Sequence, residues 1–338
     1  MKINHDITRK NSISKSIKIL LSHRSLTKYI QNRIKWHYHP RLSILEEYPF
    51  HVDIELSSYC QLKCPMCFRT HRPIENQGNM KFSTFQKIID EISGKVYSIK
   101  FTGRGETLIN NEFSRFMEYL KNKKFGEVAI ITNGQFLDNQ KMLSIIENGI
   151  DRIAFSIDGL KEKYEKIRAP IKYEEIFSIV SKLYELRKSR GGLKPLIRIQ
   201  AVKTSIDKEK QFLNTWKNIS DEIFFLEYKD YSEEAANDEQ ADYYCPALYQ
   251  RMMIHWDGTV PMCINDEYEE GVVGNILEKS VSEIWNGQRL NRAREIHKKG
   301  LRDKAYKNCA RCALHRKGHG NSSFAYKISN IFKKSKSA

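Results

Sequence analysis

The stretch HVDIELSSYCQLKCPMC, residues 51–67, places three cysteines at C-x3-C-x2-C spacing directly after a strand-like run. Three thiolates on one short loop can hold three irons of a cubane [4Fe–4S] cluster, which leaves the fourth iron without a protein ligand. An open metal position is where a small molecule can bind, as it does in catalytic zinc sites. The stretch therefore predicts a reactive metal site after a β-strand. Its ligands would be Cys60, Cys64 and Cys67.

The pair Cys64 and Cys67 would by itself also fit a zinc knuckle or a redox-active pair. Cys60 and the flanking residues favour the cluster. With 7 cysteines in 338 residues, a chance match to the full spacing is expected in only about one chain in a thousand. The clustered cysteines and the lack of a secretory leader argue against disulfides, so we expect a cytoplasmic protein.

The stretch resembles the cluster loop of the radical S-adenosylmethionine (SAM) enzymes. In that family the open iron binds the amine and carboxylate of SAM, and reductive cleavage gives a 5′-deoxyadenosyl radical. The resemblance implies an external one-electron reductant of the flavodoxin or ferredoxin type. Met66 stands where the family often has an aromatic residue against the adenine, and its sulfur can still pack on a ring face.

The alternation of elements predicts a parallel sheet. Six β-branched runs alternate with helical patterns between residue 51 and about residue 230, which is typical of β/α units with right-handed crossovers. The expected strands are His51–Leu56, Val96–Thr102, Glu127–Thr132, Arg152–Ile157, Leu196–Val202 and Glu222–Tyr228, with helices near 83–93, 111–123, 138–148, 172–189 and 207–219. This order resembles the family's partial (β/α)6 TIM-like barrel.

Polar and glycine residues follow the ends of these strands, where the active site of a parallel sheet lies. The family resemblance implies that Gly103-Arg104-Gly105-Glu106 stands for the segment that binds the SAM amino group, with Glu106 as acceptor. It also implies that Ser156 and Asp158 lie near the ribose and the methionine carboxylate. Arg168 is a candidate bidentate partner for that carboxylate, although a turn or surface ion pair would explain each residue alone.

The other four cysteines, Cys245, Cys263, Cys309 and Cys312, have C-x17-C-x45-C-x2-C spacing. Four thiolates could close either a zinc site or a second [4Fe–4S] cluster with no open iron. Residues 254–263 predict a hairpin that turns at Asp257-Gly258, and a helix start follows near residue 282. This context resembles the SPASM extension of the family in its shortened "twitch" form, which favours an auxiliary iron–sulfur cluster.

The cysteine inventory bears on the reaction. If all seven are ligands, no thiol remains to return a hydrogen atom to a substrate radical, as radical epimerases commonly require. Oxidation of a small polar substrate, such as a sugar, aminocyclitol or nucleotide-sugar, fits better, with the auxiliary cluster as electron acceptor. The layout is similar to that of twitch-bearing dehydrogenases of the family. Arg104, Tyr243 and Tyr244 are candidate catalytic residues; further candidates at the barrel mouth are His71, Glu227 and Lys229.

Three other functions stay open. A peptide-modifying maturase is the first, although residues 1–50 read as basic helix without strand pairs and are short for a leader-peptide domain. A radical epimerase that uses a tyrosine as donor is the second. The third is a zinc-bearing nucleic-acid-binding protein, which the net charge of +16 invites.

The charge distribution argues against specific nucleic-acid binding. Residues 1–50 hold 10 Lys/Arg and 3 Asp/Glu, a net charge of +7, and residues 315–338 hold 6 Lys/Arg and no acid, a net charge of +6. The ends thus carry +13 of the +16, and the body carries only +3. Solvated tails are the simplest interpretation. Ser14–His37 predicts one or two amphipathic basic helices that pack on the barrel, with weak peripheral membrane contact as the alternative.

These patterns predict four regions. They are a basic helical extension (1–50), a radical SAM partial barrel (51–235), a SPASM/twitch domain of hairpin plus helix (236–318) and a basic tail (319–338). No apolar run is long enough to cross a membrane.

Overall fold

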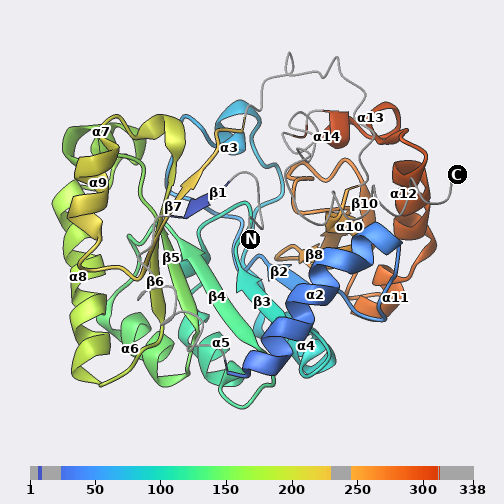
Figure 1. Cartoon of the computed structure of the whole chain (residues 1–338), viewed down its shortest axis with the longest axis horizontal. Helices are drawn as coiled ribbons and strands as arrows, with labels where there is room; N and C mark the ends of the chain where they lie inside the picture. The colour runs from blue at the N-terminus through green and yellow to red at the C-terminus, as the bar shows by residue number, and fades with distance from the viewer. Residues whose placement is uncertain (1–6, 10–23, 230–244, 311, 313–338) are drawn as a thin grey trace, which may run out of the picture.

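The computed structural model describes residues 7–9, 24–229, 245–310 and 312, and its core is a twisted sheet wrapped by helices (Figure 1). The strand order is β1-β7-β6-β5-β4-β3-β2-β8. All neighbours pair in parallel except β1, which pairs antiparallel with β7. The expected barrel sheet is confirmed, and it holds seven parallel strands.

The six predicted strands are all present. They are β2 (His51–Ile54), β3 (Ser98–Phe101), β4 (Glu127–Thr132), β5 (Arg152–Ser156), β6 (Leu196–Val202) and β7 (Glu222–Leu226). Their burial explains why apolar runs marked them: Ile54, Ile99 and Ile153 are fully buried between the sheet and its helices.

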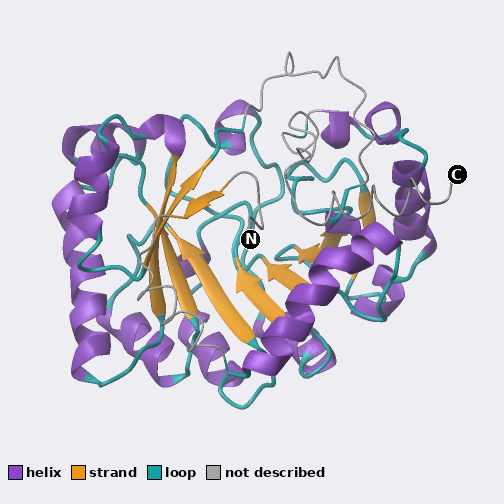
Figure 2. Cartoon of the chain, in the orientation of Figure 1, coloured by secondary structure: helices purple, strands orange, loops and turns teal. Residues whose placement is uncertain are grey.

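The predicted helices lie around the outside of the strands (Figure 2). They are α4 (Phe82–Ile92), α5 (Phe113–Leu120), α6 (Asn139–Glu147), α8 (Tyr173–Ser189) and α9 (Glu209–Trp216). Shorter elements that the sequence analysis did not separate are α3 (Phe68–His71), α7 (Lys161–Ile167), η1 (Thr107–Ile109) and η2 (Lys203–Ser205). In Figure 1, α3 and α7 lie toward the top, beyond the carboxyl ends of β2 and β5.

The N-terminal region differs from the prediction. Residues 1–50 were expected to lack strand pairs, but β1 (Ile7–Arg9) pairs with Glu222–Leu226 and covers that edge of the sheet. An open strand edge offers unpaired backbone groups, so covering it is favourable. Helix α2 (Leu26–Leu42) confirms the helical prediction from Leu26 onward and continues past His37, whereas residues 10–23 lie outside the described part of the chain.

The C-terminal region also differs in its strand pairing. The turn at Asp257-Gly258 is present, and His255 N–H donates to Thr259 O over 2.8 Å. However, β8 (Arg251–Ile254) pairs with β2 of the barrel, and β9 (Thr259–Pro261) pairs antiparallel with β10 (Val272–Asn275). The turn of the predicted hairpin is therefore confirmed, and the strands on its two sides pair with different partners. The cause is that β2 pairs with all four residues of β8 in a parallel ladder, whereas β9 is only three residues long.

Short helices complete this region. They are α10 (Ala247–Gln250), α11 (Val281–Trp285), α12 (Gln288–Lys298), α13 (Arg302–Ala305) and α14 (Lys307–Ala310). The predicted helix start near residue 282 is confirmed, because Ser280 and Glu283 form a capping box at the start of α11. No helix of the described residues is both long and apolar enough to span a membrane.

A buried charge cluster fixes β8 on the barrel. Asp53 of β2 is fully buried. It accepts from Arg251 Nε of β8 over 2.8 Å and pairs with Lys100 Nζ of β3 over 3.0 Å. Burial by itself would raise the pKa of Asp53, but Arg251 and Lys100 hold that pKa well below its ordinary value. The carboxylate is therefore ionised and joins three neighbouring strands.

Replacing this carboxylate should loosen β8. We expect Asp53→Asn to lower the free energy of unfolding at neutral pH by about 3 kcal/mol, because two partly buried cations lose their counter-charge. Since the folded pKa is depressed, the Asp53 contribution is present above the ordinary carboxyl pKa and is lost as the pH falls through the folded value. Anaerobic urea unfolding would measure this. Asp90→Asn, at an exposed ion pair with Lys123, is the control and should change little.

Candidate active site

The cysteine triplet lies on the loop between β2 and α3. Cys64 is buried, whereas Cys60 and Cys67 are partly buried. The loop is closed by backbone bonds: Cys67 N–H donates to Cys64 O over 2.9 Å, and Thr70 N–H donates to Cys67 O over 2.9 Å. Burial raises the pKa of all three thiols, that of Cys60 to about 11. An electropositive metal must therefore displace these protons when it binds.

The segment after β3 lies directly against this loop. Glu106 N–H donates to Tyr59 O over 2.7 Å. A Cβ atom on Gly105 would collide with the backbone of Ser57 and Tyr59, so only glycine fits there. The glycine is therefore required by close approach to the chain's own cluster loop. A Cβ on Gly103 would likewise collide with the Glu55 side chain.

Glu106 is held between the ends of β3 and β4. Its carboxylate accepts from Leu108 N–H over 3.0 Å, from the Thr132 hydroxyl over 2.5 Å and from Asn133 N–H over 2.7 Å. A carboxylate accepts about four hydrogen bonds, so one acceptor position remains. Burial raises the pKa of Glu106. The side chain can thus present a fixed acceptor toward a ligand ammonium next to the triplet.

Arg168 brings a cation to the triplet. Its Nε donates to Asp158 Oδ2 over 2.9 Å, and a second nitrogen of the guanidinium pairs with the same carboxylate. Asp158 is fully buried and also accepts from Val202 N–H over 2.6 Å and from Ser205. Burial alone would lower the pKa of Arg168, but Asp158 and the Cys64 thiol raise it overall. Arg168 is therefore a permanent cation that Asp158 orients beside Cys64.

Ser156 and Met66 complete the set of expected SAM contacts. The Ser156 hydroxyl, at the end of β5, accepts from Gln200 Nε2 over 3.1 Å. Met66 is partly buried and packs against the core beside the triplet. Ser156 is two residues before Asp158, and Met66 lies in the cluster loop between Cys64 and Cys67.

Arg104 forms ion pairs with two glutamates from different parts of the molecule. Its guanidinium is 5% exposed and donates to Glu55 Oε1 over 2.8 Å and to Glu269 Oε1 over 2.7 Å. Glu269 also contacts His255 Nδ1 over 2.6 Å. Glu55 belongs to the barrel and the other two to the C-terminal region. Arg104 therefore joins these two parts of the molecule.

The second cysteine set gathers in the C-terminal region. Burial raises the pKa of Cys245 to about 11 and raises those of Cys263 and Cys309, and each of these three thiols is electrostatically coupled to other members of the set, including Cys312. Among the residues that the structure describes, no three His, Cys, Asp or Glu side chains converge as the ligands of a single ion do. Soft, buried thiol donors are the ligands that iron–sulfur clusters take.

Two side-chain nitrogen atoms contact this set, and the sequence analysis missed both residues. Asn265 Nδ2 lies 3.7 Å from Cys312 Sγ, and His297 Nε2 lies 3.6 Å from Cys309 Sγ. Burial lowers the pKa of His297 to about 4, so its imidazole is neutral near pH 7. Neither residue stands beside a cysteine in an obvious motif, although Asn265 follows Cys263 by two positions.

The loop of residues 265–271 lies between the two cysteine sets. Asn265 contacts Cys312, and the charge of Glu267 acts on the Cys67 thiol of the triplet. Tyr268 donates its hydroxyl proton to Phe68 O over 3.0 Å, directly after Cys67. Lys229, just beyond β7, pairs with Glu267 and lies 3.4 Å from Asn265 Oδ1. One loop thus contacts the surroundings of both sets.

Other expected site residues fall elsewhere. Tyr243 and Tyr244 lie outside the described residues.

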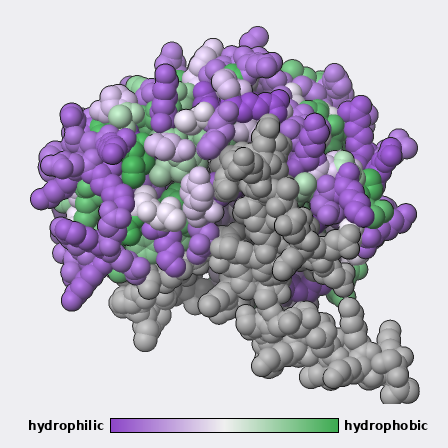
Figure 3. All heavy atoms as spheres, turned by 90° about the horizontal axis from the view of Figure 1, so that it is seen from above, coloured by the Kyte–Doolittle hydropathy of each residue, from purple (hydrophilic) through white to green (hydrophobic). Residues whose placement is uncertain are grey.

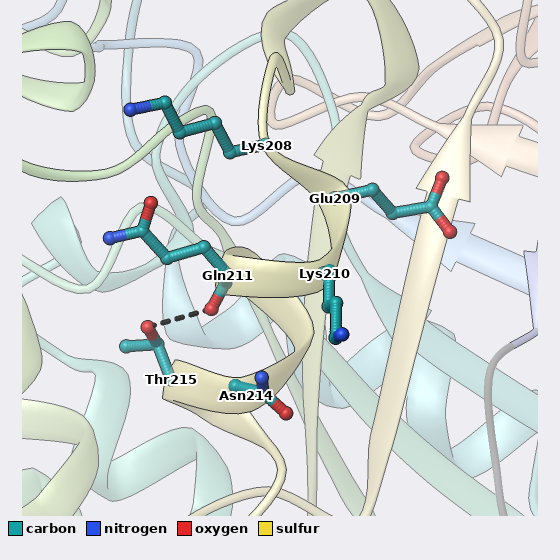
Figure 4. Close-up of a pocket in the computed structure, with 6 residues that line it drawn as sticks. All are labelled: Lys208, Glu209, Lys210, Gln211, Asn214 and Thr215. Atoms are coloured by element: carbon teal, nitrogen blue, oxygen red, sulfur yellow. Dashed lines mark hydrogen bonds between the residues drawn. The ribbon is translucent and has the colours of Figure 1, made fainter.

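A surface hollow of about 680 Å³ runs along α9 (Figure 4), and its six lining residues are all polar. None of them is a cysteine or a strand-end residue of the site. Seen from above, the described surface is hydrophilic around most of its rim (Figure 3).

Comparison with family models decides the family. The model of the radical SAM superfamily matches residues 54–193, which include the triplet, Glu106 and Arg168. The chain belongs to the radical SAM superfamily. The SPASM model, an iron–sulfur cluster-binding domain, matches residues 245–313, which include the other four cysteines. This radical SAM enzyme therefore uses a [4Fe–4S] cluster with SAM and carries an auxiliary iron–sulfur cluster, as the sequence predicted.

Individual relatives of the chain share only a modest fraction of its residues. A Pyrococcus furiosus tungsten-containing aldehyde ferredoxin oxidoreductase cofactor-modifying protein is 26% identical, over 78% of this chain and 87% of the relative. The SAM-dependent 2-deoxy-scyllo-inosamine dehydrogenase of Niallia circulans is 22% identical, over 76% of this chain and 91% of the relative. The crystal structure of BtrN in complex with AdoMet and 2-DOIA has a TM-score of 0.55 at 18% identity, over 78% and 92% of the two chains, a likeness of fold.

The position of Arg168 generates a prediction for SAM binding. We expect Arg168→Met to weaken SAM binding by about tenfold to a hundredfold, because an oriented cation is lost. The affinity of Arg168→Lys for SAM should fall between those of Arg168→Met and the wild type, since a lysine keeps the charge but lacks the bidentate fork. Equilibrium dialysis with labelled SAM would measure the affinity. Lys166→Met, on the exposed side of α7, is the control. Equal affinities in all four proteins would remove Arg168 from the site.

Proposed function

We propose that this enzyme dehydrogenates a small polar alcohol, such as a sugar, an aminocyclitol or a nucleotide-sugar. The observation that carries the proposal is the grouping of all seven cysteines into two sets, each at least partly buried, which leaves no spare thiol as a hydrogen-atom donor. The Niallia circulans relative, a dehydrogenase by name, aligns over 91% of its length and supports the same reaction type.

The proposed ligand sets follow the geometry. Cys60, Cys64 and Cys67 hold the cluster that binds SAM, and Cys245, Cys263, Cys309 and Cys312 hold the auxiliary cluster. Glu106 accepts from the SAM ammonium, and Arg168 pairs with its carboxylate. Gly103 and Gly105 shape the backbone beside the ligand, whereas Met66, Ser156 and Asp158 contact or orient it.

When bound, the SAM-binding cluster supplies a hydrogen-atom acceptor, which is made from SAM with one electron from an external reductant. The auxiliary cluster supplies an electron acceptor. A carbinol substrate then loses a hydrogen atom from carbon, a proton from oxygen and one electron, and becomes a ketone. Glu267 is our candidate proton acceptor, because it pairs with Lys229 between the two cysteine sets and its negative charge helps to raise the pKa of the Cys67 thiol. Arg104 holds these two parts together through its ion pairs with Glu55 and Glu269.

The auxiliary site needs a potential that accepts an electron. Hydrogen bonds to cluster sulfurs raise that potential, because they stabilise the more negative reduced state. The neutral imidazole of His297 has one N–H, and its Nε2 lies beside Cys309 Sγ. The amide of Asn265 does the same for Cys312. We propose that these two side chains tune the acceptor.

A pair of cysteine variants tests which cysteine set supports SAM cleavage and which supports substrate oxidation. Cys64→Ala should abolish SAM cleavage, because the first cluster loses a ligand. Cys309→Ala should still cleave SAM but form no ketone. The measurements are 5′-deoxyadenosine release and product by mass spectrometry, with candidate alcohols deuterated at the carbinol carbon. Deuterium should appear in 5′-deoxyadenosine. Ketone formation by Cys309→Ala would refute the acceptor role, and solvent deuterium in a recovered alcohol would indicate epimerisation.

The hydrogen bonds to sulfur predict a shift in potential. His297→Phe should lower the midpoint potential of the auxiliary cluster by about 20–60 mV, the equivalent of one weak hydrogen bond for a one-electron couple. Asn265→Ala should shift it in the same direction. An anaerobic redox titration followed by electron paramagnetic resonance would measure it. His37→Phe, on α2, is the control and should leave the potential unchanged.

A further inference from the structure

Helix α2 concentrates the exposed apolar surface of the protein. Among the described residues, twelve large apolar side chains are exposed, and six of them lie within residues 26–44. Five of these six recur at every fourth position of the helix, with exposed fractions from 43% to 64%. Residues at this spacing share one side of an α-helix. We call this set the α2 stripe; it consists of Leu26, Ile30, Ile34, Tyr38 and Leu42.

The other side of α2 is anchored to the barrel. The Trp36 ring lies 6.5 Å from the Phe50 ring, and Pro40 is buried. Gln250 Nε2 donates to Trp36 O over 2.7 Å, which ties the helix to α10. Arg24, just before the helix, donates to Gly149 O over 2.8 Å. The helix is therefore held in place with its stripe outward, along the outside of the molecule in Figure 1.

The charge around the stripe selects its partner. Helix α2 contains no aspartate or glutamate, and Lys28 and Arg41 are exposed on it, whereas Lys35 pairs with Glu46 over 2.9 Å and the partly buried Arg33 lies over the Trp36 ring. Residues 1–50 carry a net charge of +7 and residues 315–338 carry +6. Either end of the chain would bring more positive charge to this face and be repelled, and so would the α2 helix of a second copy that docked through the same stripe. Nucleic acid would match the charge but offers no apolar layer for the stripe.

We propose that α2 attaches the enzyme to an anionic phospholipid surface. A helix with an apolar side and flanking lysines and arginines lies in the plane of a membrane, with its apolar side chains at the boundary of the acyl chains. Its cations lie at the level of the anionic headgroups, which attract them. This attachment is independent of the proposed dehydrogenation, because none of the α2 residues belongs to either cysteine site.

Vesicle flotation tests the attachment. The cluster-loaded full chain is mixed with vesicles of phosphatidylcholine alone or of equal parts phosphatidylcholine and phosphatidylglycerol. We expect flotation with the mixed vesicles and none with phosphatidylcholine alone. Ile30→Gln/Ile34→Gln should weaken binding at least tenfold, and Lys28→Gln/Arg41→Gln should weaken it most at low salt. The matched control, Leu193→Gln/Leu277→Gln, removes equally exposed apolar side chains elsewhere and should bind as the wild type does.

SAM cleavage should be unchanged in all variants, which shows that they are folded. Three results would overturn the proposal. The first is wild-type protein that does not float with the mixed vesicles. The second is unchanged binding of Ile30→Gln/Ile34→Gln, which would assign the binding to the charged ends alone. The third is a wild-type dimer in light scattering that this variant converts to a monomer, since the stripe would then bind a second copy.

Discussion

The ion pair between Glu55 and Arg104 determines how the two halves of the site meet. Glu55 is almost fully buried directly after β2, and a buried carboxylate is stable only when it is paired. Arg104 supplies that pair from the end of β3 and extends its remaining donors to Glu269 in the C-terminal region. The triplet follows Glu55 on the same loop, and Cys263 precedes Glu269 by a few residues. The placement of one guanidinium therefore sets the relative position of both cysteine sets.

The polar groups around the triplet are fixed by the protein before any ligand is added. Glu106 accepts three hydrogen bonds from strand ends, and Asp158 orients Arg168 while it accepts from the end of β6. An acceptor and a cation are thus held at defined positions near the thiols. Charges that need not reorganise when a zwitterionic ligand arrives bind it more effectively than mobile ones. The close contact at Gly105 also holds the segment after β3 against the cluster loop.

Local patterns identified what depends on local physics. Strands β2–β7 are buried apolar runs, the helices between them are amphipathic, and the cysteine spacings are short-range motifs, so all of these were predictable. The pairing of β8 with β2 and of β1 with β7 was not, because the choice of partner depends on a distant edge. Arg104 and His297 could not be placed either. A charged or titratable residue in a sequence looks the same whether it is exposed or buried against a partner far along the chain.

The seventh parallel strand has a consequence for how the protein is made. Asp53 and Arg251, which join β2 to β8, are separated by 198 positions. The first barrel strand therefore keeps a vacant edge until residues 251–254 have emerged from the ribosome. Contacts of such long sequence separation form slowly, and an unpaired edge invites association with other nascent chains. The cluster loop that follows β2 thus stays beside an unfinished sheet until β8 has been synthesised, and translation past Ile254 is a condition for completing the sheet that carries this loop.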